Sequence, residues 1–137
     1  MKRPLEFVLD ASAILAFLKR EAGGAGVHRF LDRRSGISAV NWAETLTKLA
    51  DSGEDPLTAG VRIRSGEMLG ASLAILPFGD REAGETACLR KATHLQGLSL
   101  GDRACLATAR LLKAAAVTAD RSWSKLDIGV QIHVIRT

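Results

Sequence analysis

Short apolar runs alternate with longer helical stretches along the whole chain. The apolar runs cover residues 5–9, 36–40, 72–78, 116–119 and 131–135. The helical stretches cover residues 11–20, 27–34, 41–50, 55–66, 80–95 and 102–115. They are rich in helix formers or carry apolar residues at helical spacing. Such alternation is typical of a mostly parallel sheet flanked by helices, so the sequence predicts an α/β fold.

The size and composition of the chain are those of one globular domain. Its 137 residues suffice to bury a core, and we expect a single domain over residues 1–137. A hydrophobic share of 47% with 25% charged residues argues against disorder and fibrous structure. No apolar run approaches the roughly 20 residues that span a bilayer, and Asp10 interrupts the first run before a signal core develops. These features predict a cytoplasmic protein without a membrane segment.

The charge balance and a few residue types narrow the choice of partner and chemistry. The net charge of +4 is compatible with an acidic partner such as nucleic acid. Cys88 and Cys105 lack the spacing of a zinc site, and we expect both to be buried thiols. Trp42 and Trp123 are predicted to anchor the core rather than to stack on bases.

Four carboxylates stand after predicted strands or at the start of predicted helices. They are Asp10, Glu44, Asp102 and Asp120. Each has a structural explanation of its own, because the aspartates suit the N-cap position of a helix. Glu44 could likewise form a capping-box-like pair with Asn41 or an ion pair with Lys48. On a regular helix it points away from Leu46 and Leu49, toward water or an open cleft.

The joint placement of these acids favours a functional site. Ligands of parallel α/β sheets bind at the carboxyl ends of the strands, where residues distant in sequence meet in one groove. Clustered carboxylates repel each other, and a hard divalent cation turns the same cluster into a set of ligands. A site made only of oxygens favours Mg²⁺ or Mn²⁺ over zinc.

Four short motifs connect the chain with a known family. They run from Val8 to Ser12, from Asn41 to Glu44, from Leu100 to Arg103 and from Thr118 to Arg121. Through these motifs and its length, the chain resembles a PIN-domain ribonuclease of the VapC toxin type, and the resemblance covers essentially the whole chain. It implies a three-layer α/β sandwich with a mostly parallel central sheet. It also implies Mg²⁺ or Mn²⁺ as cofactor and endonucleolytic hydrolysis of RNA phosphodiester bonds.

The resemblance also implies a role for individual residues. The catalytic and metal-binding set is Asp10, Glu44, Asp102 and Asp120. Ser12 and Thr118 match the hydroxyl residues that support the first and the last acid. Arg103 and Arg121 are immediate neighbours of proposed ligands, and we expect them to contact RNA phosphates.

The partners implied by the resemblance are RNA and protein. They are the RNA substrate, a cognate VapB-type antitoxin and a second copy of the chain in a homodimer, with operator DNA bound only through the antitoxin complex. Two alternatives remain open. One is a housekeeping PIN-type nuclease that processes RNA or cuts DNA without an antitoxin. The other is a non-catalytic RNA-binding PIN module.

Overall fold

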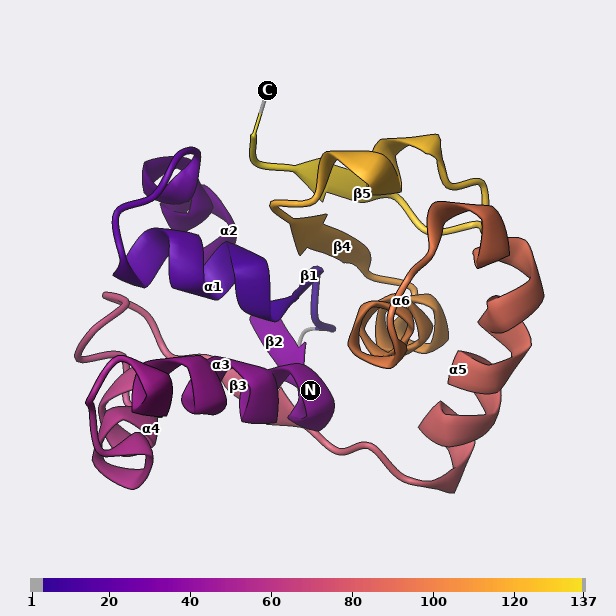
Figure 1. Cartoon of the computed structure of the whole chain (residues 1–137). Helices are drawn as coiled ribbons and strands as arrows, with labels where there is room; N and C mark the ends of the chain where they lie inside the picture. The colour runs from indigo at the N-terminus through magenta and orange to yellow at the C-terminus, as the bar shows by residue number, and fades with distance from the viewer. Residues whose placement is uncertain (1–3, 137) are drawn as a thin grey trace.

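The computed structural model describes residues 4–136 and contains the alternating strands and helices (Figure 1). The strands are β1 (Phe7–Leu9), β2 (Ser35–Ser38), β3 (Ala74–Leu76), β4 (Ala115–Thr118) and β5 (Ile132–Val134). The α-helices are α1 (Ala11–Leu18), α2 (His28–Leu31), α3 (Ala39–Asp51), α4 (Pro56–Arg64), α5 (Asp80–Ala92) and α6 (Leu100–Leu112). Short 3₁₀ helices are η1 (Gly24–Val27), η2 (His94–Gln96) and η3 (Arg121–Lys125).

All five strands lie in one parallel sheet, in the order β3-β2-β1-β4-β5. Strand β1 is central, and Phe7 lies opposite Ser35 of β2 and Ala115 of β4. Because the strands run in the same direction, the residues that follow β1, β2 and β4 meet at one edge of the sheet. The predicted α/β fold with a parallel central sheet is confirmed.

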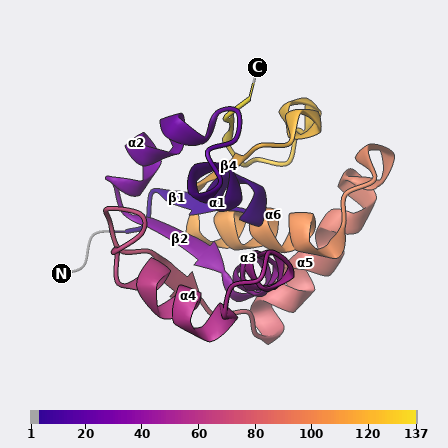
Figure 2. The ribbon, with the colours of Figure 1, turned by 60° about the vertical axis from the view of Figure 1, so that its left-hand side comes forward.

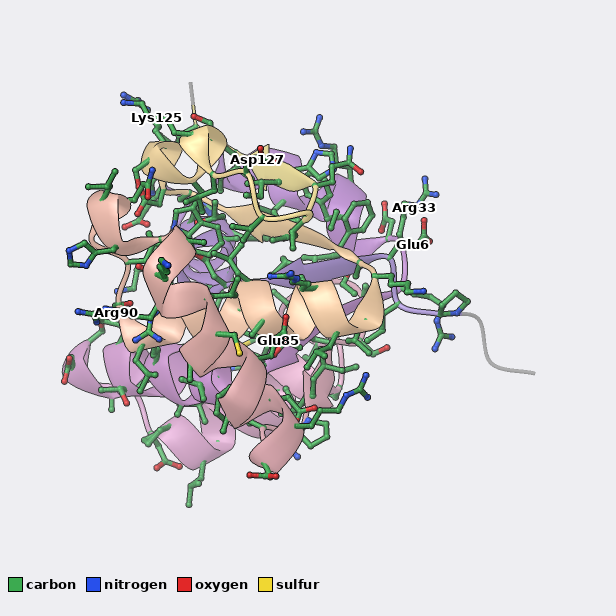
Figure 3. The ribbon with its side chains drawn as sticks, turned by 90° about the vertical axis from the view of Figure 1, so that its right-hand side faces the viewer. Glu6, Arg33, Glu85, Arg90, Lys125 and Asp127 are labelled. Atoms are coloured by element: carbon green, nitrogen blue, oxygen red, sulfur yellow. The ribbon has the colours of Figure 1, made fainter. Side chains whose placement is uncertain are left out.

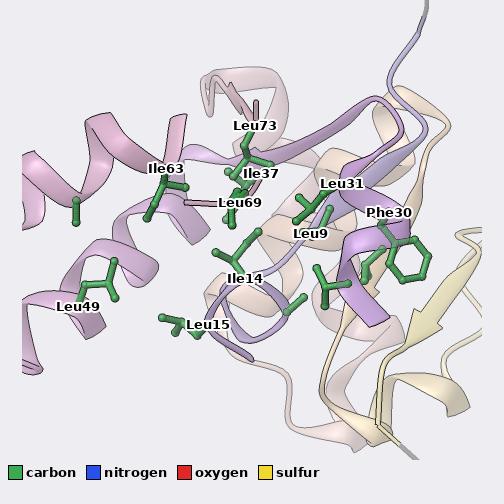
Figure 4. Close-up of a cluster of buried hydrophobic side chains, with 14 residues drawn as sticks. Leu9, Ile14, Leu15, Phe30, Leu31, Ile37, Leu49, Ile63, Leu69 and Leu73 are labelled. Atoms are coloured by element: carbon green, nitrogen blue, oxygen red, sulfur yellow. The ribbon is translucent and has the colours of Figure 1, made fainter. Parts of the chain in front are cut away.

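Helices cover both faces of the sheet and make two cores (Figure 1). Side chains alternate across a strand, so Leu9 of β1 enters one core and Val8 the other. The Leu9 side packs against residues of α1, α2, α3 and α4 (Figure 4). The Val8 side packs against α5, α6 and the fully buried Trp123 of η3. Trp42 packs, partly buried, against the first core.

Helices α3 and α6 come together at one end of the sheet. Figure 2 views α3 almost along its axis and shows it between α4 and α6. Helix α3 begins at Ala39 because the Ser38 hydroxyl accepts the backbone N–H of Val40 as an N-cap. The second strand therefore ends two residues before the predicted limit. Helix α6 begins at Leu100 rather than at Asp102, because Ser99 is its N-cap.

The opposite end of the sheet, where the strands begin, carries an ion pair. The Arg33 guanidinium donates to Glu6 Oε1 over 2.6 Å (Figure 3). Within residues 4–136, none of the helices combines the length and the apolar character needed to cross a membrane. The prediction for Cys88 was wrong: its side chain is exposed on α5, whereas Cys105 of α6 is buried as expected.

Candidate active site

Asp10 is a buried carboxylate at the junction of β1 and α1. It is 5% exposed and is the N-cap of α1, where Oδ1 accepts the Ala13 N–H over 2.9 Å. The Ser12 hydroxyl donates to the same oxygen over 2.7 Å, and the Thr118 hydroxyl donates to Oδ2 over 2.6 Å. Both oxygens of Asp10 are therefore held, and the side chain has one defined orientation.

The two hydroxyls also join the ends of β1 and β4. Ser12 Oγ accepts the backbone N–H of Ala119 over 2.9 Å, and Thr118 Oγ1 accepts that of Asp120 over 3.1 Å. Their oxygens lie 3.4 Å apart. The structure thus places the two predicted supporting residues in contact with Asp10 and with the segment that carries Asp120.

The packing of α3 on α6 brings Glu44 beside Gly101, the residue before Asp102. The side-chain amide of Asn41 donates to Glu44 Oε1 over 2.7 Å and to the carbonyl of Gly101 over 2.9 Å. Asp102 follows Gly101 directly and belongs to a capping box. Its Oδ2 accepts the Ser99 N–H over 3.0 Å, and its own N–H donates to Ser99 Oγ over 3.1 Å. Asp102 is therefore the third residue of the helix and not its N-cap.

Three of the acids share one electrostatic environment. Burial raises the pKa of Asp10 from 3.8 to about 6 against the opposing effect of its three hydrogen bonds, and the charge of Asp102 adds to the rise. The pKa of the Cys105 thiol is raised well above its ordinary value, first by burial and then by Asp10, Asp102 and Glu44. The three carboxylates thus act on the same buried sulfur.

Asp120 stands at the border of this cluster. It is the N-cap of η3, and its Oδ1 accepts the backbone N–H of Ser122 over 2.9 Å and the Ser122 hydroxyl over 2.8 Å. The residue is exposed. Its backbone is tied to the Asp10 environment through Thr118, whereas its carboxylate is turned toward η3.

The donor set fits a hard divalent cation in its chemistry. As the side chains lie, no three His, Cys, Asp or Glu residues of the described segment 4–136 are arranged to hold a metal ion. Hydrogen bonds from the backbone N–H groups of Ser99 and Ser122 hold the carboxylates of Asp102 and Asp120 against the starts of α6 and η3. Rotation of these exposed or half-buried side chains would supply oxygen ligands, the kind that Mg²⁺ and Mn²⁺ prefer.

The two predicted phosphate-binding arginines differ in their surroundings. Arg103 is half-buried and donates from Nη1 to the carbonyl of Thr86 over 3.0 Å, so its side chain turns toward α5. Arg121 is exposed at the first residue of η3, directly after Asp120. The geometry thus favours Arg121 over Arg103 as a contact for a ligand at the acids.

An apolar groove that the sequence did not reveal begins beside Glu44. It has a volume of about 660 Å³ and is lined by Ala39, Val40, Ala43, Glu44, Thr47, Lys48 and Phe78. Most of the lining comes from one face of α3. Val40, Ala43 and Thr47 stand at helical spacing, which is the only sequence signal for this surface, whereas the contribution of Phe78 depends on tertiary packing.

The raised pKa of Asp10 predicts a pH-dependent stability of the metal-free protein. A folded-state pKa above the unfolded value means that the folded state binds the proton more tightly. The contribution of Asp10 to the free energy of unfolding is therefore full below about pH 4 and is lost as the pH rises through about 6. The loss is on the order of 3 kcal/mol for a shift of about two pKa units. Thermal or urea unfolding in EDTA, with Asp10→Asn as reference, measures it. An unchanged difference between the two proteins from pH 4 to pH 7 would contradict the assignment.

Comparison with known sequences gives one family. The sequence profile of the PIN domain matches residues 7–129. A search of curated proteins finds no match.

Comparison with solved structures gives matches over nearly the full length of each chain. A toxin–antitoxin complex from Klebsiella pneumoniae aligns with a TM-score of 0.72 at 16% identity, over 95% of this chain and 98% of the other. VapC20 of Mycobacterium tuberculosis, a toxin that cleaves the sarcin-ricin loop, aligns with a TM-score of 0.68 at 16% identity, over 92% and 99%. VapBC-5 of the same organism, from the VapBC family of toxin–antitoxin systems, aligns with a TM-score of 0.61 at 25% identity, over 98% and 100%. These similarities show a shared fold.

Proposed function

The chain belongs to the PIN-domain family, and on this premise we propose that it is a Mg²⁺- or Mn²⁺-dependent endoribonuclease acting as the toxin of a VapBC-type pair. The observation that carries the proposal is the buried Asp10 carboxylate, fixed by three donors and coupled to the charge of Asp102. A carboxylate whose ionised form is disfavoured by burial and by a like charge is a strong candidate for a cation ligand.

Different residues of the chain would have different roles in phosphodiester hydrolysis. A bound Mg²⁺ or Mn²⁺ supplies Lewis-acid chemistry and neutralises charge at the phosphate. Asp10, Glu44, Asp102 and Asp120 are the proposed ligands. Ser12 and Thr118 keep the Asp10 carboxylate in one orientation, which reduces the reorganisation needed at the moment of reaction. No side chain of the protein has to act as a nucleophile in this scheme.

The groove beside Glu44 supports a single-stranded RNA substrate. It presents the apolar side chains of Val40 and Phe78 together with the cation of Lys48. An unpaired nucleotide has both an apolar base face and a charged phosphate, and RNA-binding proteins commonly contact both. An RNA-cleaving toxin would find this substrate in the cytoplasm.

The proposed partners follow from the structural relatives. One of them is a toxin–antitoxin complex and another belongs to a VapBC system, so we propose a VapB-type antitoxin for this chain. We also propose a homodimer, and contact with operator DNA only through the antitoxin complex. An antitoxin that places a basic side chain among the acids would stop cleavage. A monomer in light scattering without antitoxin would contradict the dimer.

The nuclease proposal predicts discrete, metal-dependent cleavage of RNA. Purified protein is incubated with total cellular RNA in Mg²⁺, in Mn²⁺ and in EDTA, and the new ends are mapped by sequencing. We expect defined cuts with either metal and none in EDTA, because the carboxylates alone cannot neutralise the charge that develops on the phosphate. Cleavage of DNA instead of RNA would favour a DNA nuclease, and no cleavage of any substrate would favour a binding module.

A further inference from the structure

Asn41 is a buried amide that connects two helices of the candidate site. The residue is 1% exposed on the first turn of α3. Its side-chain nitrogen donates one hydrogen bond to Glu44 Oε1 on the same helix and one to the carbonyl of Gly101 on α6. Both protons of the amide are therefore used, and the Glu44 carboxylate is tied through Asn41 to the residue that precedes Asp102.

Gly101 makes room for the Glu44 carboxylate. A Cβ atom at position 101 would lie 2.5 Å from Oε2, 2.7 Å from Oε1 and 2.8 Å from Cδ of Glu44. These separations are shorter than a van der Waals contact, so any side chain at this position would displace the carboxylate. Glycine is required here for space and not for backbone freedom, because Gly101 lies within the ordinary helical turn of α6.

We propose that Asn41 and Gly101 are positioning residues that hold the Glu44 carboxylate next to Asp102. The inference rests on the proposed nuclease function. Glu44 is exposed on α3, and a long exposed side chain samples many rotamers unless partners restrict it. The Asn41 amide supplies the restraint, and the missing side chain of Gly101 supplies the space. Residues that contact the ligands of a metal site orient those ligands and strengthen the binding of the metal.

The Gly101→Ala variant separates positioning from stability. Alanine is the better helix former, and the atoms it would meet are the end of a flexible side chain, so we expect the variant to fold with an unchanged or higher melting temperature. We expect its affinity for Mn²⁺, measured by calorimetry, and its kcat for RNA each to fall by about tenfold. The matched control is Gly84→Ala on α5, where a Cβ meets nothing within 4 Å, and Mn²⁺ binding and cleavage should stay at wild-type values.

The effect of Gly101→Ala must also pass through Glu44. In a Glu44→Ala background, no carboxylate is left to displace, so adding Gly101→Ala should change the Mn²⁺ affinity no further. Asn41→Ala should lower the melting temperature and the Mn²⁺ affinity together. Its control is Thr45→Val, which removes a buried hydroxyl that donates to the Asn41 carbonyl on the same helix. That control should lower the melting temperature alone.

The outcomes distinguish this proposal from the nuclease proposal. Wild-type Mn²⁺ binding and cleavage in Gly101→Ala, with both lost in Asp10→Asn, would overturn the positioning role and leave the nuclease function standing. If the wild-type protein neither binds Mn²⁺ nor cleaves RNA, the nuclease function fails. A double-mutant cycle of Asn41→Ala and Glu44→Ala on thermal stability then tests whether Asn41 restrains Glu44. Coupled effects would support the Asn41–Glu44 restraint, and additive effects would overturn it.

Discussion

Replacing Asp10 by asparagine is expected to lower the proposed metal-dependent RNA cleavage by about a thousandfold, equivalent to roughly 4 kcal/mol of transition-state stabilisation. Asparagine has the same shape, and its side-chain oxygen can still accept from Ser12 and Ala13. What disappears is the negative charge in the most buried position of the cluster. Cleavage of a defined RNA under single-turnover conditions measures the effect, with both proteins purified in parallel to exclude a contaminating nuclease.

The same variant should be no less stable than the wild type without metal. Burial and Asp102 disfavour the ionised Asp10, so neutral asparagine removes an unfavourable charge at neutral pH. Added Mn²⁺ should raise the melting temperature of the wild type but leave that of Asp10→Asn unchanged. Wild-type cleavage by a folded Asp10→Asn protein would remove Asp10 from the proposed site.

Truncating Trp123 is expected to have the largest effect on stability. The side chain is fully buried in the core that contains residues of α5 and α6, and large-to-small changes of a buried tryptophan cost about 3–5 kcal/mol. That is a large part of the 5–15 kcal/mol that stabilises a typical domain. Urea unfolding of Trp123→Ala, followed by circular dichroism because the change removes a fluorophore, checks the value.

Trp123→Phe is the matched control for the cavity. Among the described residues, Trp123 Nε1 is buried without a hydrogen-bond partner, so phenylalanine fills much of the space and gives up no bond. We expect it to retain more stability than Trp123→Ala by at least about 1 kcal/mol. Equal destabilisation by the two variants would contradict the view that the loss comes from the volume of the cavity.

The parts of the site that depend on local sequence could be predicted. Asp10 follows strand β1 directly and Asp120 follows strand β4 after one residue, and a parallel sheet brings such residues to one edge. Both aspartates are N-caps, as their sequence positions predict. The order of the strands could not be derived, because it depends on which apolar faces pack together.

The parts of the site that depend on tertiary contacts could not be predicted. Gly101 is 60 residues from Asn41, and no local pattern reports that a helix will leave room for a carboxylate from another helix. The turn of Arg103 toward Thr86 is of the same kind. One missed signal was local, since Ser99 followed three residues later by Asp102 is a capping-box pattern that marks the true start of α6.

The bond between Asp10 and Thr118 joins residues 108 positions apart, which has a consequence during protein synthesis. Domains begin to fold while the chain is still being made, but a contact cannot form before its later member has emerged. A nascent chain that has not reached Thr118 lacks the hydroxyl that holds Asp10 and the neighbouring strand that completes its surroundings. On the proposed function, the ribosome therefore has to translate most of the message before that nascent chain can cut RNA.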